Sequence, residues 1–362
     1  MPAHFFTGFP GFLCSELLPR VLARAPSARA ICLVQPRYSE IALTRLRELE
    51  RATPSLRGRI DLRAGDITQS DLGIAATSPL RSDVGHIWHL AAIYDLSVDR
   101  MRGMKVNVEG TRNVLDFART CGQLRRVHYV STCFVSGRHP GVFRESDLES
   151  GQAFNNAYEE TKHLAEVEVR ARMRAGLPAA IYRPAIVVGD SRSGATQKFD
   201  GPYFAMQWLL RQPRFAVMPV IGDPRATEFN VVPRDFVVDA MAHIAARDDA
   251  AGRTYQLADP HPLTVDRLLD VLATATRRRV MRLPLPLGAA KWAIDHLPGV
   301  NRTLRIPSSA VDYFVHPARY DTTNTQGALA GSGISCPPFE SYVRQLVAFA
   351  EAHPEIGSSA MA

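Results

Sequence analysis

The chain of 362 residues is long enough for one large domain, or for a principal domain that carries a smaller lobe. Its hydrophobic content of 46% and charged content of 22% are typical of soluble globular proteins, and no segment reaches the roughly 18 apolar residues of a membrane span. The net charge of +7 comes mainly from arginines spread along the chain, a distribution that argues against nucleic-acid binding. The scattered cysteines exclude a disulfide framework and a metal site, and with no signal-peptide pattern they predict a cytoplasmic protein.

In the first 190 residues, short apolar segments alternate with longer amphipathic ones, which is the pattern of βαβ units. The predicted strands, several of them apolar on both faces, are His4–Thr7, Ala30–Val34, Ile60–Ala64, His86–Leu90, Arg126–Ser131 and Ala179–Val188. The predicted helices between them are Leu13–Arg24, Ala42–Arg51, Val108–Cys121 and Tyr158–Ala175. The sequence therefore predicts an α/β fold with a doubly wound parallel sheet of the Rossmann type.

After residue 190 the pattern becomes less regular, with a loop predicted at Ser191–Pro202. The further predicted helices and strands are Tyr203–Arg211, Phe229–Val232, Arg234–Ala246, Tyr255–Ala258, Val265–Thr276, Gly288–His296 and Phe339–His353. We expect residues 1–195, joined by 225–260, to form the dinucleotide-binding domain. Residues 196–224 and 261–362 are expected to form a smaller, mostly helical substrate lobe.

The basic run Arg277-Arg278-Arg279 follows an amphipathic stretch, and we interpret it as the solvated end of a helix. A weaker alternative is peripheral membrane contact through the basic, tryptophan-containing stretch Arg277–Arg305.

A glycine-rich turn links the first predicted strand to the first helix and reads Thr7-Gly8-Phe9-Pro10-Gly11-Phe12-Leu13-Cys14. Gly8 allows a tight turn, and Gly11 lets backbone amides approach a pyrophosphate at the start of the helix. A third glycine is usual three residues later, where this chain has Cys14. At the head of a βα series, the turn predicts a dinucleotide site that includes Phe9, Pro10, Phe12 and Leu13.

The end of the second strand reads Leu33-Val34-Gln35-Pro36-Arg37 and lacks the acidic residue that would bind the adenosine ribose of NAD. Arg37 is a candidate partner for the 2′-phosphate of NADP. The sequence therefore favours NADPH as the cofactor, with NADH as the alternative.

Tyr158 and Lys162 stand one helical turn apart and point to the same face of a predicted helix. A fixed cation near a tyrosine lowers the pKa of the phenol toward the working range, and the lysine can also bind a nicotinamide ribose. With 10 tyrosines and 4 lysines in 362 residues, about 0.1 such pairs are expected by chance. The strand end before this helix delivers a further hydroxyl, Thr132. These three residues are the candidate catalytic set.

Several motifs together resemble the extended short-chain dehydrogenase/reductase family over about residues 4–260. They are Thr7-Gly8-x-x-Gly11, Gly65-Asp66-Ile67, His89-Leu90-Ala91-Ala92, Asn107-Val108-Glu109-Gly110-Thr111, Val130-Ser131-Thr132, Tyr158-x-x-x-Lys162 and Arg183-Pro184. The resemblance implies that Asp66 and Ile67 border the adenine and that Leu90, Ala91 and Ala92 line the dinucleotide. It also implies that Asn107 supports the active-site helix and that Pro184 lies beside the nicotinamide.

Other details resemble the thioester reductase and fatty acyl-CoA reductase branch of that family: Gly11-Phe12-Leu13, Gly176-Leu177-Pro178, Val188-Gly189-Asp190-Ser191 and Phe229-Asn230-Val231-Val232-Pro233. This resemblance implies NADPH-dependent reduction of an acyl thioester to an aldehyde, with a second reduction to the alcohol left open. The acyl group would arrive on coenzyme A or on an acyl carrier protein. Two alternatives stay open: a ketone or alcohol oxidoreductase (or epimerase) for a steroid-, flavonoid- or nucleotide-sugar-like substrate, and a non-enzymatic dinucleotide sensor.

Overall fold

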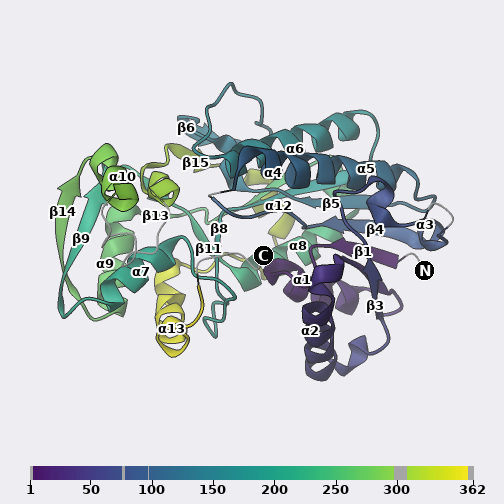
Figure 1. The fold of residues 1–362 in the computed structure, drawn as a ribbon, viewed down its shortest axis with the longest axis horizontal. Helices are drawn as coiled ribbons and strands as arrows, with labels where there is room; N and C mark the ends of the chain where they lie inside the picture. Colours follow the sequence, from purple (N-terminus) through teal and green to yellow (C-terminus); the bar gives the residue numbers. More distant parts are fainter. Residues whose placement is uncertain (1–2, 76–77, 97, 297–307, 358–362) are drawn as a thin grey trace.

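The computed structural model describes residues 3–75, 78–96, 98–296 and 308–357 (Figure 1). Within these ranges, seven strands form one parallel sheet in the order β12-β7-β5-β4-β1-β2-β3. Its strands are β1 (Ala3–Thr7), β2 (Ala30–Val34), β3 (Ile60–Ala64), β4 (Val84–His89), β5 (Arg126–Val130), β7 (Ala179–Pro184) and β12 (Thr254–Leu257). The predicted doubly wound α/β fold is confirmed.

Helices cover both faces of this sheet, so successive strand residues enter two different cores. On one face Phe6, Cys32 and Trp88 pack with α1 (Phe12–Arg24), α2 (Ser39–Ala52), α8 (Arg234–Ala245) and α12 (Thr323–Leu329). On the other face Phe5 and Ile31 pack with α5 (Gly110–Arg119) and α6 (Ala157–Arg174). Figure 1 shows α5 and α6 above the sheet and α1 and α2 below it.

A third apolar core lies away from the large sheet, at the left in Figure 1. It gathers side chains from α7 (Pro202–Leu210), α9 (Val265–Ala275), α13 (Phe339–Ala352) and β9 (Phe215–Ile221). Nearby elements are β8 (Ile186–Val188), β10 (Glu228–Phe229), β11 (Val231–Pro233), β13 (Leu263–Thr264), β14 (Arg279–Leu285) and α10 (Leu287–His296). The aromatic residues Tyr203 and Phe204 are buried in this part of the fold.

The remaining elements are short and connect these cores. They are α3 (Leu80–Asp83), α4 (Arg100–Gly103), the π-helical turn Met104–Glu109, β6 (Gly141–Phe143) and β15 (Ala318–Tyr320), with 3₁₀ turns at 36–38, 54–56, 70–73, 133–136, 248–250 and 308–315. Strand β15, late in the chain, pairs in parallel with β6. The chain therefore returns to the large sheet domain at β15 and α12 before α13 packs in the third core.

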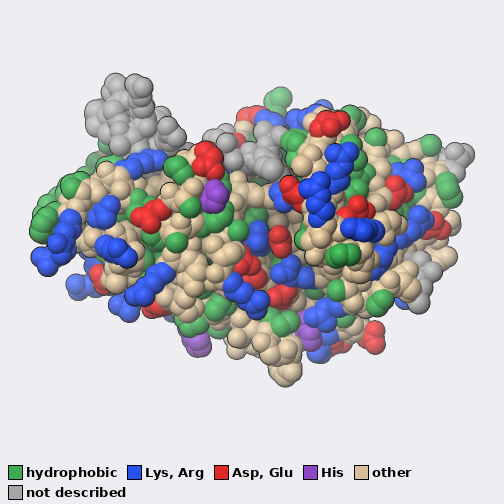
Figure 2. All heavy atoms as spheres, turned by 90° about the horizontal axis from the view of Figure 1, so that it is seen from below, with side chains coloured by type: hydrophobic (Ala, Val, Ile, Leu, Met, Phe, Trp, Pro, Cys, Tyr) green, Lys and Arg blue, Asp and Glu red, His purple; other side chains and the backbone are tan. Residues whose placement is uncertain are grey.

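Two strands of the third core, β9 and β14, were not predicted. They pair in parallel with each other alone, and their outward face exposes Phe215, Met281 and Leu283. Figure 2 shows hydrophobic side chains at this end of the molecule, flanked by Lys and Arg. A second difference is that the predicted strand 179–188 divides at Ala185: β7 continues the large sheet, whereas β8 pairs with β11.

The interpretation of the basic run as a solvated helix end is wrong for Arg278. Its guanidinium donates hydrogen bonds to the carbonyls of Leu209, Leu210, Gln212 and Thr276, so it caps the C-terminal ends of α7 and α9. Part of the stretch considered for membrane contact, 297–305, lies outside the described residues. Among the helices that the structure describes, none is long and apolar enough to cross a membrane.

Candidate active site

The glycine turn lies where β1 ends and α1 begins, and two of its glycines have no room for a side chain. Gly8 has a φ of +94°, and a Cβ there would lie 2.8 Å from the amide nitrogen of Ala91 and 2.9 Å from the carbonyl carbon of Leu90. A Cβ at Gly11 would lie 2.6 Å from the carbonyl oxygen of Gly8. The turn is therefore a narrow cradle formed by the backbone, and Gly11 is the N-cap residue of α1. This is the geometry that admits a pyrophosphate against helix amides.

The neighbours of these glycines are tightly packed. Phe9 and Pro10 are buried, and the Pro10 carbonyl accepts a hydrogen bond from Ser15. Phe12 and Leu13 begin α1 and are half-buried. Cys14, in the place of a third glycine, is buried in the core beneath α1. The side chain of Cys14 therefore packs inside the core and does not obstruct the glycine turn.

The residues expected around the adenosine lie at the ends of β2 and β3. Arg37 is exposed: it donates a 2.8 Å hydrogen bond to Gln35 and lies over the ring of Tyr38. Asp66 accepts hydrogen bonds from the amide and hydroxyl of Thr68, and Ile67 is buried against α5. Because β1, β2 and β3 are parallel neighbours in the sheet, these residues lie at the same edge of the sheet as the glycine turn.

A chain of buried polar side chains connects the glycine turn to helix α6. His89 bonds Thr7 through Nδ1 at 2.7 Å and Thr111 through Nε2 at 3.0 Å. The Thr111 hydroxyl donates to the Asn107 carbonyl, and the Asn107 amide donates to Thr161 of α6 at 3.0 Å. Burial lowers the pKa of His89 to about 3, so its ring stays neutral. These contacts hold α6 at a fixed position relative to the cofactor cradle.

Asn107 also fixes the loop after β4. Its side-chain oxygen accepts from the Ile93 amide at 2.9 Å, and its nitrogen donates to the Ile93 carbonyl. Leu90 and Ala91, which face Gly8, are half-buried at the start of this loop, and Ala92 is exposed. The structure therefore brings Asn107 against both the loop and α6.

Tyr158 and Thr132 lie together at the carboxyl edge of the sheet. Tyr158 begins α6, where Asn156 caps the helix, and Thr132 follows β5. Burial raises the pKa of Tyr158 above its ordinary value, while a hydrogen bond with Thr132 acts in the opposite direction. The Thr132 hydroxyl also lies 3.5 Å from the carbonyl of Pro184, at the end of β7. A protonated phenol, hydrogen-bonded to a second hydroxyl, is suited to donate a proton to an oxygen.

Lys162 is buried one turn along α6 from Tyr158. Its ammonium donates to the hydroxyl of Tyr129 at 3.1 Å and to the carbonyl of Val130 at 2.8 Å. Burial lowers the pKa of Lys162 to about 7, against the opposing charge of Glu166. These two hydrogen bonds tie α6 to strand β5, and the effect of this lysine on the pKa of Tyr158 stays a prediction.

A buried ion pair lies directly behind these residues. Glu166 of α6 and Arg183 of β7 are both fully buried, and the guanidinium binds both carboxylate oxygens, at 2.6 and 3.0 Å. Ser131, next to Thr132, donates to the same carboxylate at 2.6 Å. Burial would raise the pKa of Glu166, but Arg183 and Arg170 hold it below its ordinary value. The pair therefore fixes the ends of β5 and β7 against α6.

Sequence reasoning missed Tyr129, Glu166 and the residues that cover Tyr158. Glu166 stands four and eight residues after Lys162 and Tyr158, and this helical spacing was a usable signal. The ring of Tyr94 packs edge-on against Tyr158, with ring centroids 5.1 Å apart, and Lys198 lies 3.9 Å above the Tyr94 ring. These two residues come from distant loops, so no local pattern indicated them.

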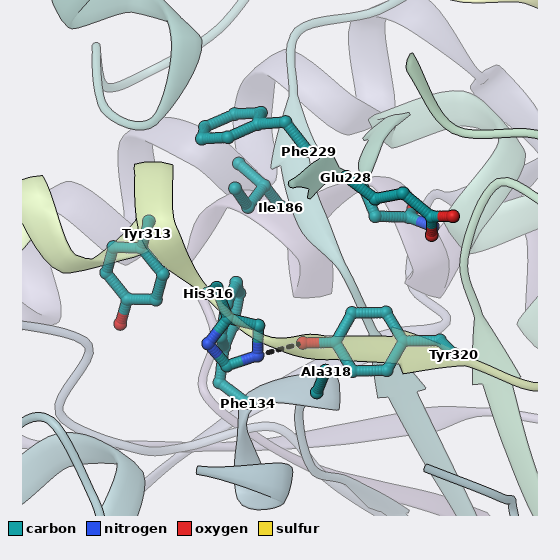
Figure 3. Close-up of a pocket in the computed structure, with 9 residues that line it drawn as sticks. Phe134, Ile186, Glu228, Phe229, Tyr313, His316, Ala318 and Tyr320 are labelled. Atoms are coloured by element: carbon teal, nitrogen blue, oxygen red, sulfur yellow. Dashed lines mark hydrogen bonds between the residues drawn. The ribbon is translucent and has the colours of Figure 1, made fainter. Parts of the chain in front are cut away.

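A small aromatic hollow, with a free volume of about 10 Å³, lies near the candidate catalytic residues, and Figure 3 shows the side chains that line it. Two of the lining residues are near neighbours of the candidate site in the sequence. Phe134 follows Thr132 by two positions and Ile186 follows Pro184 by two, so the hollow adjoins the candidate site. His316 shares a 2.9 Å hydrogen bond with the Tyr320 hydroxyl, as Figure 3 shows. The complete lining is Phe134, Ile186, Glu228, Phe229, Asn230, Tyr313, His316, Ala318 and Tyr320.

Comparisons with known proteins agree with this geometry. Residues 6–241 match the model of an NAD-binding family described as male sterility protein. The chain is 29% identical to aldehyde reductase lnbA of Aspergillus flavus over 94% of its length and 34% of that protein. It is also 29% identical to glycine betaine reductase ATRR of Emericella nidulans over 74% of its length and 22% of that protein.

Among solved structures, the terminal R domain from the myxalamid PKS-NRPS biosynthetic pathway superposes with a TM-score of 0.81 at 26% identity. The match covers 98% of this chain and 91% of that domain. The chain thus spans nearly all of one reductase domain, but between 5% and 36% of the first curated relatives that it matches.

Proposed function

The chain belongs to the male sterility protein family of NAD-binding reductases, within the extended short-chain dehydrogenase/reductases, and from that premise we propose that it reduces an acyl thioester to an aldehyde. The observation that carries the proposal is the buried Tyr158–Thr132 hydroxyl pair beside Pro184 and the aromatic hollow. Its relatives include an aldehyde reductase and the R domain of a peptide-synthetase pathway.

The cofactor is a nicotinamide dinucleotide, which supplies the hydride when bound. Gly8 and Gly11 form the cradle for the pyrophosphate, because any side chain at either position would fill it. Asp66 and Ile67 border the adenine, Leu90, Ala91 and Ala92 line the dinucleotide, and Pro184 lies beside the nicotinamide. We propose NADPH as the preferred form, since Arg37 is an exposed cation at the end of β2 without an acidic partner among the described residues.

The catalytic residues act on the substrate carbonyl. Thr132 and Tyr158 donate hydrogen bonds to the carbonyl oxygen, where negative charge develops as the hydride adds to the carbon. Tyr158 then transfers its proton to that oxygen and gives a hemithioacetal. When the hemithioacetal loses its proton and breaks the carbon–sulfur bond, the products are an aldehyde and a free thiol. Lys162 holds α6 against β5 and binds the nicotinamide ribose.

We propose that residues 196–224 and 261–362 form the substrate lobe and that 1–195 and 225–260 form the cofactor domain, with β15 and α12 of the lobe's segment packed against the cofactor domain. We propose that the acyl chain binds at the hollow lined by Phe134 and Phe229, whose apolar surface suits a hydrocarbon or aromatic acyl group once the lining side chains move apart to admit it. We propose that an acyl carrier protein or coenzyme A presents this thioester, as expected for a relative of a peptide-synthetase R domain.

The test is consumption of NADPH by the purified chain with thioesters, aldehydes and ketones, with free thiol measured in parallel. We expect one thiol for each thioester reduced, and a Tyr158→Phe rate at least about 100-fold lower. Tyr342→Phe is the matched control, because the Tyr342 hydroxyl is buried and has no hydrogen-bond partner in the described residues. Cofactor oxidation with ketones alone, without thiol, would assign the chain to ketone reduction instead.

Cofactor preference has its own test. Arg37→Ala should raise the KM for NADPH and leave the KM for NADH unchanged, because only NADPH carries a 2′-phosphate. Equal effects on both would show that Arg37 does not read that phosphate.

A further inference from the structure

One arginine near the glycine turn has no role in the chemistry described so far. Arg234 is the first residue of α8, and its backbone amide donates to the carbonyl of Gly189. Its side chain is only 11% exposed and lies over the ring of Phe12, 5.0 Å from the centroid. Phe12 directly follows Gly11, so the guanidinium lies beside the N-terminal end of α1. Figure 1 shows α1 and α8 close together at this place.

The guanidinium of Arg234 lacks hydrogen bonds within the described residues. Its Nε atom is buried without a partner. The neighbouring carboxylate oxygens of Glu16 and Asp190 lie 3.7 and 3.9 Å from its terminal nitrogens, which is beyond hydrogen-bond distance. Glu16 and Asp190 form ion pairs with this cation, but a nearly buried guanidinium whose N–H groups lack acceptors is unfavourable, so a further acceptor that completes the set is expected.

The two acidic neighbours are already engaged elsewhere. Glu16 binds Arg20 through its other carboxylate oxygen at 3.2 Å. Asp190 accepts hydrogen bonds from Ser193 and from the amide of Arg192. The oxygens that face Arg234, Oε1 of Glu16 and Oδ2 of Asp190, form ion pairs with it at 3.7 and 3.9 Å but make no hydrogen bond to it, and they belong to two different carboxylates. The planar fork of an arginine matches two oxygens of one phosphate.

We propose that Arg234 binds the pyrophosphate of the dinucleotide, together with the backbone amides of the glycine turn. The proposal rests on the proposed function, because it needs a dinucleotide in the Gly8–Gly11 cradle. The helix amides at Gly11 supply partial positive charge, and Arg234 adds a full charge on the side of α8. Its location separates it from Arg37, which lies at the end of β2 and is assigned to the 2′-phosphate.

The alternative is that Arg234 only holds α1 and α8 together. Arg20 already does this: it bonds Glu16 of its own helix and Asp239 of α8. Arg20 has the same charge and joins the same two helices, but lies two turns along α1 from Phe12. It is therefore the matched control.

The experiment measures direct binding of NADPH, NADH and adenosine 2′-monophosphate to the full chain, for Arg234→Met, Arg234→Lys and Arg20→Met. We expect Arg234→Met to weaken both dinucleotides by about 10-fold or more and to leave the monophosphate, which has no pyrophosphate, unaffected. Arg234→Lys should recover part of the loss, since it keeps the charge without the fork. Thermal unfolding of each variant reports its effect on stability.

Three results would overturn the inference. The first is unchanged dinucleotide binding by Arg234→Met, and the second is an equal loss of dinucleotide affinity in Arg20→Met. The third is a loss of affinity confined to NADPH, which would assign Arg234 to the 2′-phosphate. If Arg234→Met does not fold, the affinities of Arg234→Lys and the parent chain are compared instead. A lysine variant that binds both dinucleotides as tightly as the parent chain would contradict a bidentate contact from Arg234. Failure of the parent chain to bind any dinucleotide would instead contradict the proposed function.

Discussion

The Glu166–Arg183 pair allows a quantitative prediction. Both side chains are fully buried, and the carboxylate accepts hydrogen bonds from Ser131, Arg170 and Arg183. Glu166→Gln keeps the shape of the side chain but removes its charge, and it turns an NH₂ group toward donors. Arg183 would then be a buried cation without its counter-ion, although the Asp147 carbonyl still accepts from it.

Removing one partner of a buried ion pair lowers the free energy of unfolding by about 3–5 kcal/mol. For a chain of 362 residues we expect the melting temperature to fall by about 4–7 °C. Urea titration followed by circular dichroism measures the change in free energy, with the slope of the transition as a check on two-state behaviour.

Glu168→Gln is the control on the same helix. Glu168 pairs with Arg112 at 2.6 Å, but both side chains are partly exposed, so the loss should stay below about 1 kcal/mol. The double variant Glu166→Leu/Arg183→Leu should recover part of the stability lost in Glu166→Gln, because no unpaired charge is then left behind. If Glu166→Gln and Glu168→Gln lower stability equally, the assignment of the buried pair as the support of α6 is wrong.

Three further predictions concern other parts of the fold. Gly8→Ala should weaken dinucleotide binding by at least about 10-fold, measured by calorimetry, because its Cβ would lie 2.8 Å from the Ala91 amide; unchanged affinity would contradict the cradle. Burial raises the pKa of Glu159 from 4.5 to about 7, so its contribution to stability is present below pH 4.5 and is lost as the pH rises through 7. Urea midpoints of Glu159→Gln should show a smaller fall over that range than the parent chain, and an identical fall would refute this. Glu145→Ala leaves the amide donors of Gln256 and Thr325 without their acceptor, so hydrogen exchange should accelerate across residues 318–329; unchanged protection would show that other contacts hold this segment.

The large sheet could be predicted because its signals are local. Each strand is a short apolar run followed by a helix, and the glycine turn and the Tyr158–Lys162 pair each lie within a few residues. The position of each motif in the βα series was then sufficient to predict that Thr132, Tyr158 and Pro184 lie at one edge of the sheet, as the structure shows.

The small sheet could not be predicted for an equally physical reason. Its strands β9 and β14 each contain a proline, Pro219 and Pro284, and pair only with each other across about 60 residues of intervening chain. β9 is apolar throughout and β14 carries two arginines among apolar residues, and neither pattern indicates which strand is its partner. The role of Arg278 was predicted wrongly because its acceptors belong partly to α7, a distant segment.

The supports of the site escaped prediction because they join distant elements. An isolated Glu or Arg in a sequence is most often exposed, and only the fold brings Glu166 of α6 to Arg183 of β7. The same holds for Lys162, whose partners Tyr129 and Val130 lie on the preceding strand. Sequence spacing indicated the candidate catalytic residues, whereas the contacts that hold them in place depend on the packing of distant elements.

The contacts of Glu145 also set an order in time during synthesis. This carboxylate follows β6, and two of its donors, the amide and hydroxyl of Thr325, come 180 positions later. At roughly 5–20 residues per second, a ribosome needs about 10–35 s to add that interval. During this period β6 has no β15 to pair with, and a carboxylate destined for burial faces water. The two-stranded sheet of β6 and β15 is therefore completed only after residues 318–325 have been added, long after β6 itself.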